Sequence, residues 1–504
     1  MNVRQRQMNK GLEEKKRISG TKSRGSDSKT SSEMPRRQRW LKIRYLVPLI
    51  PLAGLFFIYI GLANDADGFH YGNKAIDSLI TSMNLHEPFH VVVIDAGSTA
   101  SRVLAFTFHE SMVNGQLILD DELFYETKPG LSSFAKNPAG VEKSLNILIQ
   151  KAKSKIPESK WSQTPLTMKA TAGLRLLPDQ IAQQILKECK RVFNASGFNV
   201  SDDSVSIMEG SDEGIFSWFT VNFLLGRFSK SGTSAEYSAD TVAALDLGGG
   251  STQVTFAVEP STVEHSENSS KSEKSIFNIN AFNRNISIYT RSFLGLGLMA
   301  ARKAILTHPD NHMNKEKVPN LAQSSSEHIE LRAECVNPII TGAEWSYGGK
   351  NYLVKGPENG SFKMIKTENF GGSNEKRPIV RFSSCIEIVK KVVSTGTPRD
   401  IPNFSQHEIY AFSYYFERMV EVGLVDPFKG GIITIGSIRK AALETCEYAN
   451  TDQPFMCLDL TFIYTLLHDG FGLDDKSEFT LRKKVEGHEL SWGLGAAFSL
   501  IRGS

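Results

Sequence analysis

Two short stretches carry the same order of residue types, and that order suits phosphate chemistry. They are Asp95-Ala-Gly-Ser-Thr-Ala-Ser-Arg102 and Asp246-Leu-Gly-Gly-Gly-Ser-Thr-Gln253. Glycine lets a turn approach a ligand closely, and exposed N–H groups and hydroxyls donate to anionic oxygens. The leading aspartate suits a hydrated divalent cation, because hard cations such as Mg²⁺ keep waters and take few carboxylates. Two facing copies would bind one polyphosphate, whereas the alternative is a pair of unrelated glycine-rich turns.

A third stretch supplies a candidate base for activating water. Glu213 lies among several acids just before the apolar residues 215–225, which predict a fully buried helix. Burial beside such a wall raises the pKa of a carboxylate, as a general base requires. The alternative is capping of the helix N-terminus, which we favour for Asp212. The small-residue turn from Lys169 to Arg175 offers Thr171 and Arg175 to phosphate, or is an ordinary strand end.

The elements that must position these residues follow an α/β pattern. Each glycine-rich stretch lies between two apolar runs, which predicts strand, turn and strand twice (89–94 with 103–106, and 242–245 with 254–256). Residues 178–194 predict an amphipathic helix that buries Cys189 as a free thiol. Gly295-Leu-Gly-Leu-Met-Ala300 matches a dinucleotide-binding fingerprint. Because it lies far downstream of both loops, we interpret it as close packing of a helix start.

The charge is divided unevenly along the 504 residues. Residues 1–44 hold 14 Lys/Arg and 4 Asp/Glu, while the rest holds 44 and 51. The basic excess is therefore a tail, and it is no argument for nucleic-acid binding. We predict a disordered cytosolic tail at 1–45, a transmembrane signal anchor over the uncharged residues 46–63, and a stalk at 64–88. A cleaved signal peptide is the alternative to the anchor, and partial release by cleavage stays open.

Two further features favour a lumenal or extracellular body. Six Asn-x-Ser sequons lie beyond the anchor, at Asn194, Asn199, Asn268, Asn285, Asn359 and Asn403. Four cysteines cluster in the C-terminal part, which suits two disulfides: Cys335, Cys385, Cys446 and Cys457. Three pairings are possible, of which Cys446 with Cys457 is the short clip.

Taken together, the motifs resemble those of the apyrase family, the E-type nucleoside triphosphate diphosphohydrolases. The sequence is most similar to the branch of Golgi and endoplasmic-reticulum nucleoside diphosphatases. Five family regions occur in order over about residues 89–500: 95–102, 169–177, 209–226, 246–253 and 490–496. The first loop departs from many relatives at Ala100-Ser101, which keep small size and a hydroxyl. The chain also shows no second hydrophobic span at its C-terminus.

The resemblance implies a fold and a set of site residues. The fold is α/β, with two RNase-H-like lobes, as in actin and the sugar kinases, around a nucleotide cleft. Lobe I is expected at 89–208 plus about 487–504, and lobe II at 209–486. The implied metal residues, acting through water, are Asp95 and Asp246, and the implied catalytic residues are Glu213, Ser251, Gln253 and Thr171. The implied phosphate-binding residues are Gly97, Ser98, Thr99, Arg102, Gly248, Gly249, Gly250 and Ser251. Our candidates for stacking the base are Tyr414, Tyr415 and Phe416, with core packing as the alternative.

The expected function is hydrolysis of nucleoside diphosphates such as UDP and GDP in the secretory lumen, with triphosphates cleaved more weakly. Glu-activated water would attack in line, assisted by Ca²⁺ or Mg²⁺. The protein is expected to be a disulfide-bonded, glycosylated, monomeric type II protein of the Golgi or endoplasmic-reticulum membrane. One alternative is a secreted apyrase that acts on ATP and ADP. Another is an inactive nucleotide-binding protein.

Overall fold

The computed structural model divides into two compact units, Met1–Ile76 and Asp77–Ser504, and the second contains the elements below. The described residues are Gly54 and the ranges 87–111, 115, 117–228, 240–259, 275–281, 284–311, 328–366, 374–397, 401 and 404–502. The predicted tail, the stalk up to residue 86 and, apart from Gly54, the anchor lie outside them. Among the described residues, no helix is long and apolar enough to cross a bilayer.

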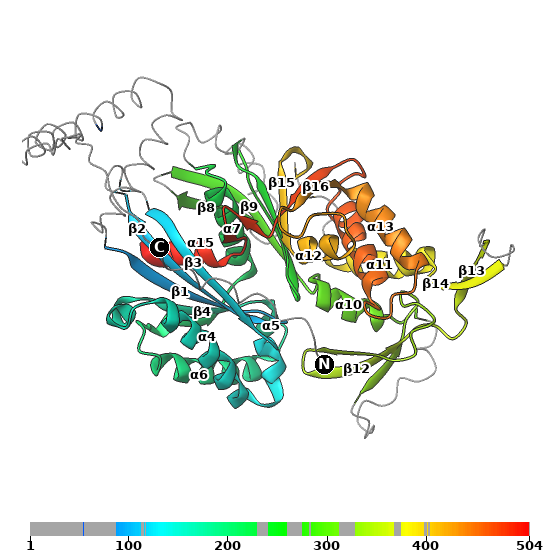
Figure 1. Cartoon of the computed structure of the whole chain (residues 1–504), viewed down its shortest axis with the longest axis horizontal. Helices are drawn as coiled ribbons and strands as arrows, with labels where there is room; N and C mark the ends of the chain where they lie inside the picture. Colours follow the sequence, from blue (N-terminus) through cyan, green and yellow to red (C-terminus); the bar gives the residue numbers. More distant parts are fainter. Residues whose placement is uncertain are drawn as a thin grey trace, which may run out of the picture. The chain divides into compact units, whose positions relative to one another are not determined.

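The first lobe is built on a five-stranded sheet with the order β3-β2-β1-β4-β5 (Figure 1). Its strands are β1 (Phe89–Ala96), β2 (Ser101–Glu110), β3 (Leu117–Thr127), β4 (Leu166–Ala170) and β5 (Val205–Ile207). The apolar side chains of α4 (Val141–Lys155) and α6 (Asp179–Asn194) cover one face. Helix α6 confirms the helix predicted at 178–194, with Pro178 as its N-cap and Cys189 as a buried free thiol.

The second lobe is built on a seven-stranded sheet with the order β16-β17-β15-β6-β7-β9-β8. Its strands are β6 (Ala243–Leu247), β7 (Ser251–Ala257), β8 (Ile276–Ala281), β9 (Arg284–Leu294), β15 (Ile409–Ser413), β16 (Gly431–Thr434) and β17 (Glu478–Leu481). The helices are α10 (Leu298–Leu306), α11 (Phe382–Gly396), α12 (Tyr414–Glu421), α13 (Ile435–Glu447) and α14 (Met456–Thr465). They share one apolar core with the sheet. The two lobes confirm the α/β architecture that the motifs predicted.

Two helices connect the sheets through a shared core. Helix α7 (Gly210–Leu224) packs on β6, β7 and β9, while α15 (Gly493–Arg502) packs on β1, β2 and α7. One apolar cluster accordingly contains side chains from both sheets and both helices, including Phe106, Trp218, Phe412 and Phe498. Helix α7 begins earlier than the apolar pattern suggested. Glu213 therefore lies inside its first turn and not ahead of it.

Smaller elements complete the second lobe and the C-terminal region. They are β10 (Ile329–Arg332), β11 (Ala343–Tyr347), β12 (Lys350–Lys355), β13 (Ser361–Lys366), β14 (Asn374–Ile379), β18 (Lys484–Val485) and β19 (His488–Glu489). Cys335 is bonded to Cys385 and Cys446 to Cys457, which confirms the predicted short clip and fixes the other pair. Four of the sequon asparagines are exposed, namely Asn194, Asn199, Asn285 and Asn359. Asn268 and Asn403 lie outside the described residues.

Candidate active site

The two glycine-rich stretches form tight turns that meet each other. In the β1–β2 hairpin Asp95 stands opposite Arg102, and in the β6–β7 hairpin Asp246 stands opposite Gln253. A Cβ added to Gly249 would lie 2.3 Å from the Ser98 hydroxyl oxygen. A side chain at position 249 would displace the Ser98 hydroxyl, so glycine allows the two turns to lie directly against each other.

The start of α10 fixes the β6–β7 turn. The N–H groups of Leu298 and Met299 donate to the carbonyls of Gly248 and Gly249, at 2.9 and 3.0 Å. A Cβ on Gly297 would lie 2.3 Å from the backbone nitrogen of Ser251. This confirms close packing of a helix start, since the N–H groups that a dinucleotide would need already bind the turn. Because α10 binds these carbonyls, the opposite edge of the turn can present N–H groups and hydroxyls to a ligand.

The β1–β2 turn is held by different means. The Ser132 hydroxyl donates to the Ser98 carbonyl at 3.2 Å. A Cβ on Gly173, in the short helix α5 (Ala172–Arg175), would lie 2.7 Å from the Ser98 Cα. The β1–β2 turn is therefore fixed by a side-chain hydroxyl and close backbone packing, whereas the β6–β7 turn is fixed by helix N–H groups.

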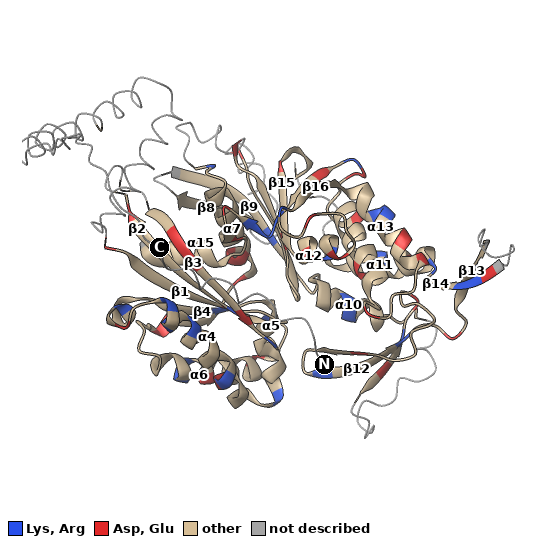
Figure 2. Cartoon of the chain, in the orientation of Figure 1, with Lys and Arg blue, Asp and Glu red and all other residues tan. Residues whose placement is uncertain are grey.

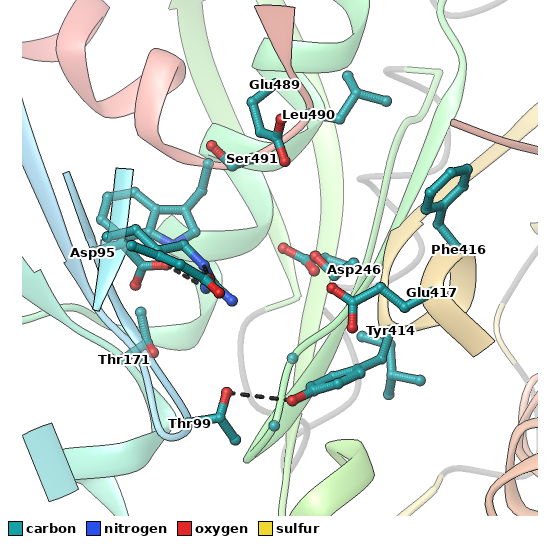
Figure 3. Close-up of a pocket in the computed structure, with 18 of the residues that line it drawn as sticks. Asp95, Thr99, Thr171, Asp246, Tyr414, Phe416, Glu417, Glu489, Leu490 and Ser491 are labelled. Carbon is teal, nitrogen blue, oxygen red and sulfur yellow. Dashed lines mark hydrogen bonds and ion pairs between the residues drawn. The ribbon is translucent and has the colours of Figure 1, made fainter. Parts of the chain in front are cut away.

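A cavity of about 260 Å³ lies over both turns (Figure 3). Two basic side chains, Arg102 and Lys483, line it. Its six acidic side chains are Asp95, Glu126, Glu213, Asp246, Glu417 and Glu489. Figure 2 shows acidic segments along β3, the strand that carries Glu126. This excess of negative charge opposes a polyphosphate unless a cation accompanies it.

The two aspartates are buried and differ in their partners. Arg102 Nη1 donates to Asp95 Oδ2 at 3.0 Å, and its Nε donates to Glu126 at 3.2 Å. The Ser217 hydroxyl donates to Asp246 Oδ2 at 3.2 Å. Burial raises the pKa of both aspartates, and for Asp95 the charge of Arg102 opposes the rise. Asp95 Oδ1 is buried and has no hydrogen bond of normal geometry within the described residues, which fits a ligand with donors or positive charge.

Glu213 is held by two donors at a single oxygen. Its Oε2 accepts from Arg175 Nη2 and, at 3.0 Å, from Gln253 Nε2. The same Gln253 nitrogen lies 2.8 Å from the Ser251 hydroxyl and 2.9 Å from that of Ser292. Burial raises the pKa of Glu213 to about 8. Arg175 opposes this rise, while Asp246 and Asp95 add to it. A buried carboxylate with a raised pKa, held beside the phosphate turns, is suited to accept a proton from water.

The structure brings most of the sequence-predicted site residues to this cavity. Its lining includes Asp95, Gly97, Thr99, Arg102, Thr171, Glu213, Asp246, Gly248, Gly249, Tyr414 and Phe416. The other predicted residues of the turns lie beside this lining, namely Ser98, Gly250, Ser251 and Gln253. Tyr415 is the exception, and its predicted stacking role is wrong. It is fully buried in the core of the second lobe, because the phase of α12 turns it away from the cavity.

Several cavity residues were not identified from the sequence. Glu126, Glu417, Lys483 and Glu489 come from strands, a helix and a hairpin far apart in the chain, and none belongs to a glycine-rich turn. Burial raises the pKa of Glu489 to about 7, against the opposing charges of Lys483 and Lys484. Arg175 stood out only as a possible phosphate contact, whereas its guanidinium pairs with Glu213.

Comparison with known proteins gives one family. The profile described as GDA1/CD39 (nucleoside phosphatase) family matches residues 82–504. The chain is 37% identical over 414 residues to the nucleoside diphosphate phosphatase ENTPD5 of Homo sapiens, covering 82% of this chain and 87% of that protein. It is 36% identical over 427 residues to the nucleoside-diphosphatase uda-1 of Caenorhabditis elegans, covering 82% and 81%. A solved nucleoside triphosphate hydrolase structure from Neospora caninum shares the fold, with a TM-score of 0.52 and 14% identity over 86% of this chain and 96% of that one.

Proposed function

Because the chain belongs to the GDA1/CD39 (nucleoside phosphatase) family, we propose that it hydrolyses nucleoside diphosphates to monophosphate and phosphate, and triphosphates more weakly. The observation that carries the proposal is Glu213, held by Arg175 and Gln253 beside two glycine-rich turns. Two of the relatives, ENTPD5 and uda-1, are named as nucleoside diphosphatases, which supports the preference for diphosphates. The family expected from the sequence motifs is thereby confirmed.

A divalent cation, Ca²⁺ or Mg²⁺, completes this proposal. Asp95 and Asp246 would hold it through water. The acidic lining fits such a group, as does the buried Asp95 Oδ1, which makes no hydrogen bond of normal geometry within the described residues. When bound, the cation neutralises phosphate charge and so makes phosphorus more open to attack.

The residues of the chain account for the remaining steps. N–H groups and hydroxyls of both turns bind the phosphates, assisted by Arg102, and Thr171 lies beside them. Ser251 and Gln253 orient the attacking water. Glu213 accepts its proton at Oε1, because Oε2 already accepts from Arg175 and Gln253. Positioning and charge neutralisation then carry phosphoryl transfer to water, without a covalent enzyme intermediate.

The proposed setting is the lumen of the secretory pathway, with the enzyme monomeric and anchored by residues 46–63. Four exposed sequon asparagines and two disulfides support this setting, since glycans and disulfides are acquired there. The proposed lobe boundaries remain 89–208 plus about 487–504, and 209–486.

The test is phosphate release by the purified chain from Asp77 onward, with UDP, GDP, ADP, ATP and AMP, in Ca²⁺, Mg²⁺ or EDTA. We expect UDP or GDP to be cleaved faster than ATP, AMP to be inert, and EDTA to stop release. Equal cleavage of ATP and ADP would favour the broad apyrase instead. No cleavage of any nucleotide would indicate a binding protein, and activity that survives EDTA would contradict the cation.

A further inference from the structure

We propose that Glu417 selects the base of the nucleotide. Its carboxylate would accept a hydrogen bond from the ring N–H that uracil, guanine and hypoxanthine carry. Adenine and cytosine present a ring-nitrogen lone pair at the same place, which a carboxylate repels. This inference rests on the proposed function and specifies which nucleoside diphosphates the cavity accepts.

Glu417 occupies the cavity wall formed by the start of α12. Ser413, Tyr414, Phe416 and Glu417 all line the cavity. Ser413, the residue before the helix, has a φ of 58°, a strained value for a residue other than glycine. Such strain persists only where the surrounding structure imposes it, so the first turn of α12 is held in a defined place beside the cavity.

The Glu417 carboxylate keeps its hydrogen-bonding capacity. It is exposed, and within the described part of the chain it makes no hydrogen bond or ion pair. Glu421, one helical turn later, pairs with Arg418 at 2.8 Å. Arg418 also lies 3.5 Å from Asp459, so the nearest cation of the helix is already engaged by other carboxylates. An ionisable group on a cavity wall that is left for a ligand is suited to recognition.

The neighbours of Glu417 place it on the nucleoside side of the phosphates. The Tyr414 hydroxyl donates to Thr99 Oγ1, in the β1–β2 turn, at 3.3 Å. Figure 3 shows Tyr414 extending from Thr99 toward the wall of the cavity opposite Asp95, where Glu417 and Phe416 lie; in this view the Glu417 carboxylate is between Tyr414 and Asp246. A nucleotide with its phosphates on the turns would thus extend along Tyr414 toward Glu417, where aromatic rings can also contact a base.

The experiment compares kcat/KM for the five substrates UDP, GDP, IDP, ADP and CDP in wild type, Glu417→Gln and Glu421→Gln. It also measures 2′-deoxy-UDP, as a control for contacts with the ribose. Glutamine keeps the size of the side chain and adds an N–H donor, which can bind the ring nitrogen of adenine or cytosine. We expect Glu417→Gln to lower the ratio of UDP to CDP by about tenfold or more, mainly through KM. Glu421→Gln, a matched change that does not line the cavity, should leave the ratio unchanged. Thermal unfolding checks that both variants fold.

Three results would overturn the inference. One is an equal change for all five substrates in Glu417→Gln, and another is an unchanged UDP to CDP ratio. The third is a loss of discrimination between UDP and 2′-deoxy-UDP without a change between bases, which would assign Glu417 to the ribose. If wild type cleaves no nucleotide, the proposed function fails separately. The same ratios are then measured by equilibrium binding of UDP and CDP.

Discussion

The β1–β2 turn and the β6–β7 turn share their residue order but differ at the residue opposite the aspartate. In the first turn this residue is Arg102, which neutralises Asp95 directly. In the second it is Gln253, which leaves Asp246 to a hydroxyl and reaches instead toward Glu213. In the proposed mechanism, one register position thus gives the first lobe a cation for phosphate and the second lobe the support for the base.

The two turns also differ in what holds them. Backbone N–H groups of a regular helix fix the carbonyls of Gly248 and Gly249, whereas the Ser132 hydroxyl holds the Ser98 carbonyl. Helix N–H groups are fixed by the backbone, while a hydroxyl can rotate. We infer that the second turn is the more rigid of the two, which suits its proposed role in orienting the attacking water.

The largest expected effect follows from removing the base in the second lobe. Glu213→Gln should lower kcat about 10³-fold with KM nearly unchanged, because the amide cannot accept a proton from water. Steady-state phosphate release measures kcat and KM, and equilibrium binding of the nucleotide checks that affinity is unchanged. Near-normal turnover would remove Glu213 from the mechanism.

The same variant should fold at least as stably as wild type at pH 8. The raised pKa of Glu213 means that its ionisation opposes folding, so wild type loses stability as pH rises from about 4.5 to 8, whereas a glutamine does not ionise.

The pH dependence of the reaction tests the same carboxylate. Glu213 must be ionised to act, so kcat/KM should rise about tenfold per pH unit below its pKa of about 8 and level off above it. A bound cation, which offsets the charges of Asp95 and Asp246, should move this limb to lower pH. Arg175→Gln should move it to higher pH, because Arg175 stabilises the ionised form. A flat profile from pH 5 to 9 would contradict the assignment.

Substituting the residue opposite each aspartate tests the difference between the two turns. Arg102→Gln should raise KM about tenfold with a smaller change in kcat, because the phosphates lose a cation. Gln253→Asn shortens the amide that reaches Glu213 and Ser251, so kcat should fall about 100-fold with KM little changed. Steady-state kinetics with UDP separate the two constants. The same kcat and KM pattern in both variants would refute the division between the lobes.

The smallest effect is expected at the support of the first turn. Ser132→Ala removes the donor to Ser98 O, so KM should rise about two- to threefold and stability should fall by about 1 kcal/mol. Ser154→Ala, which removes an exposed serine that donates to Lys151, is the control in the unfolding and kinetic measurements. A rise in KM as large as that of Arg102→Gln would show that the Ser132 hydroxyl contributes as much to this turn as the Arg102 cation does.

The sequence predicted the features that depend on neighbouring residues. The strands around Asp95 and Asp246, helix α6, the Cys446–Cys457 clip and the close packing at Gly297 all follow from local order or short spacing. Glu213 could be singled out because an acid adjoins a long apolar run. The start of its helix was misplaced because Gly210 to Asp212 interrupt the apolar pattern, although backbone hydrogen bonds continue through them.

The sequence by itself therefore determined the paired turns, their aspartates and the family. The tertiary structure alone decided which distant groups complete them, because pairing across a sheet and the phase of a helix are not encoded in nearby residues. Sheet register brings Glu126 of β3 to Arg102. The ion pair of Arg175 with Glu213 joins α5 to α7, two helices that lie far apart in the sequence. The phase of α12 buries Tyr415 and leaves Glu417 facing the cavity, since successive helical side chains point about 100° apart.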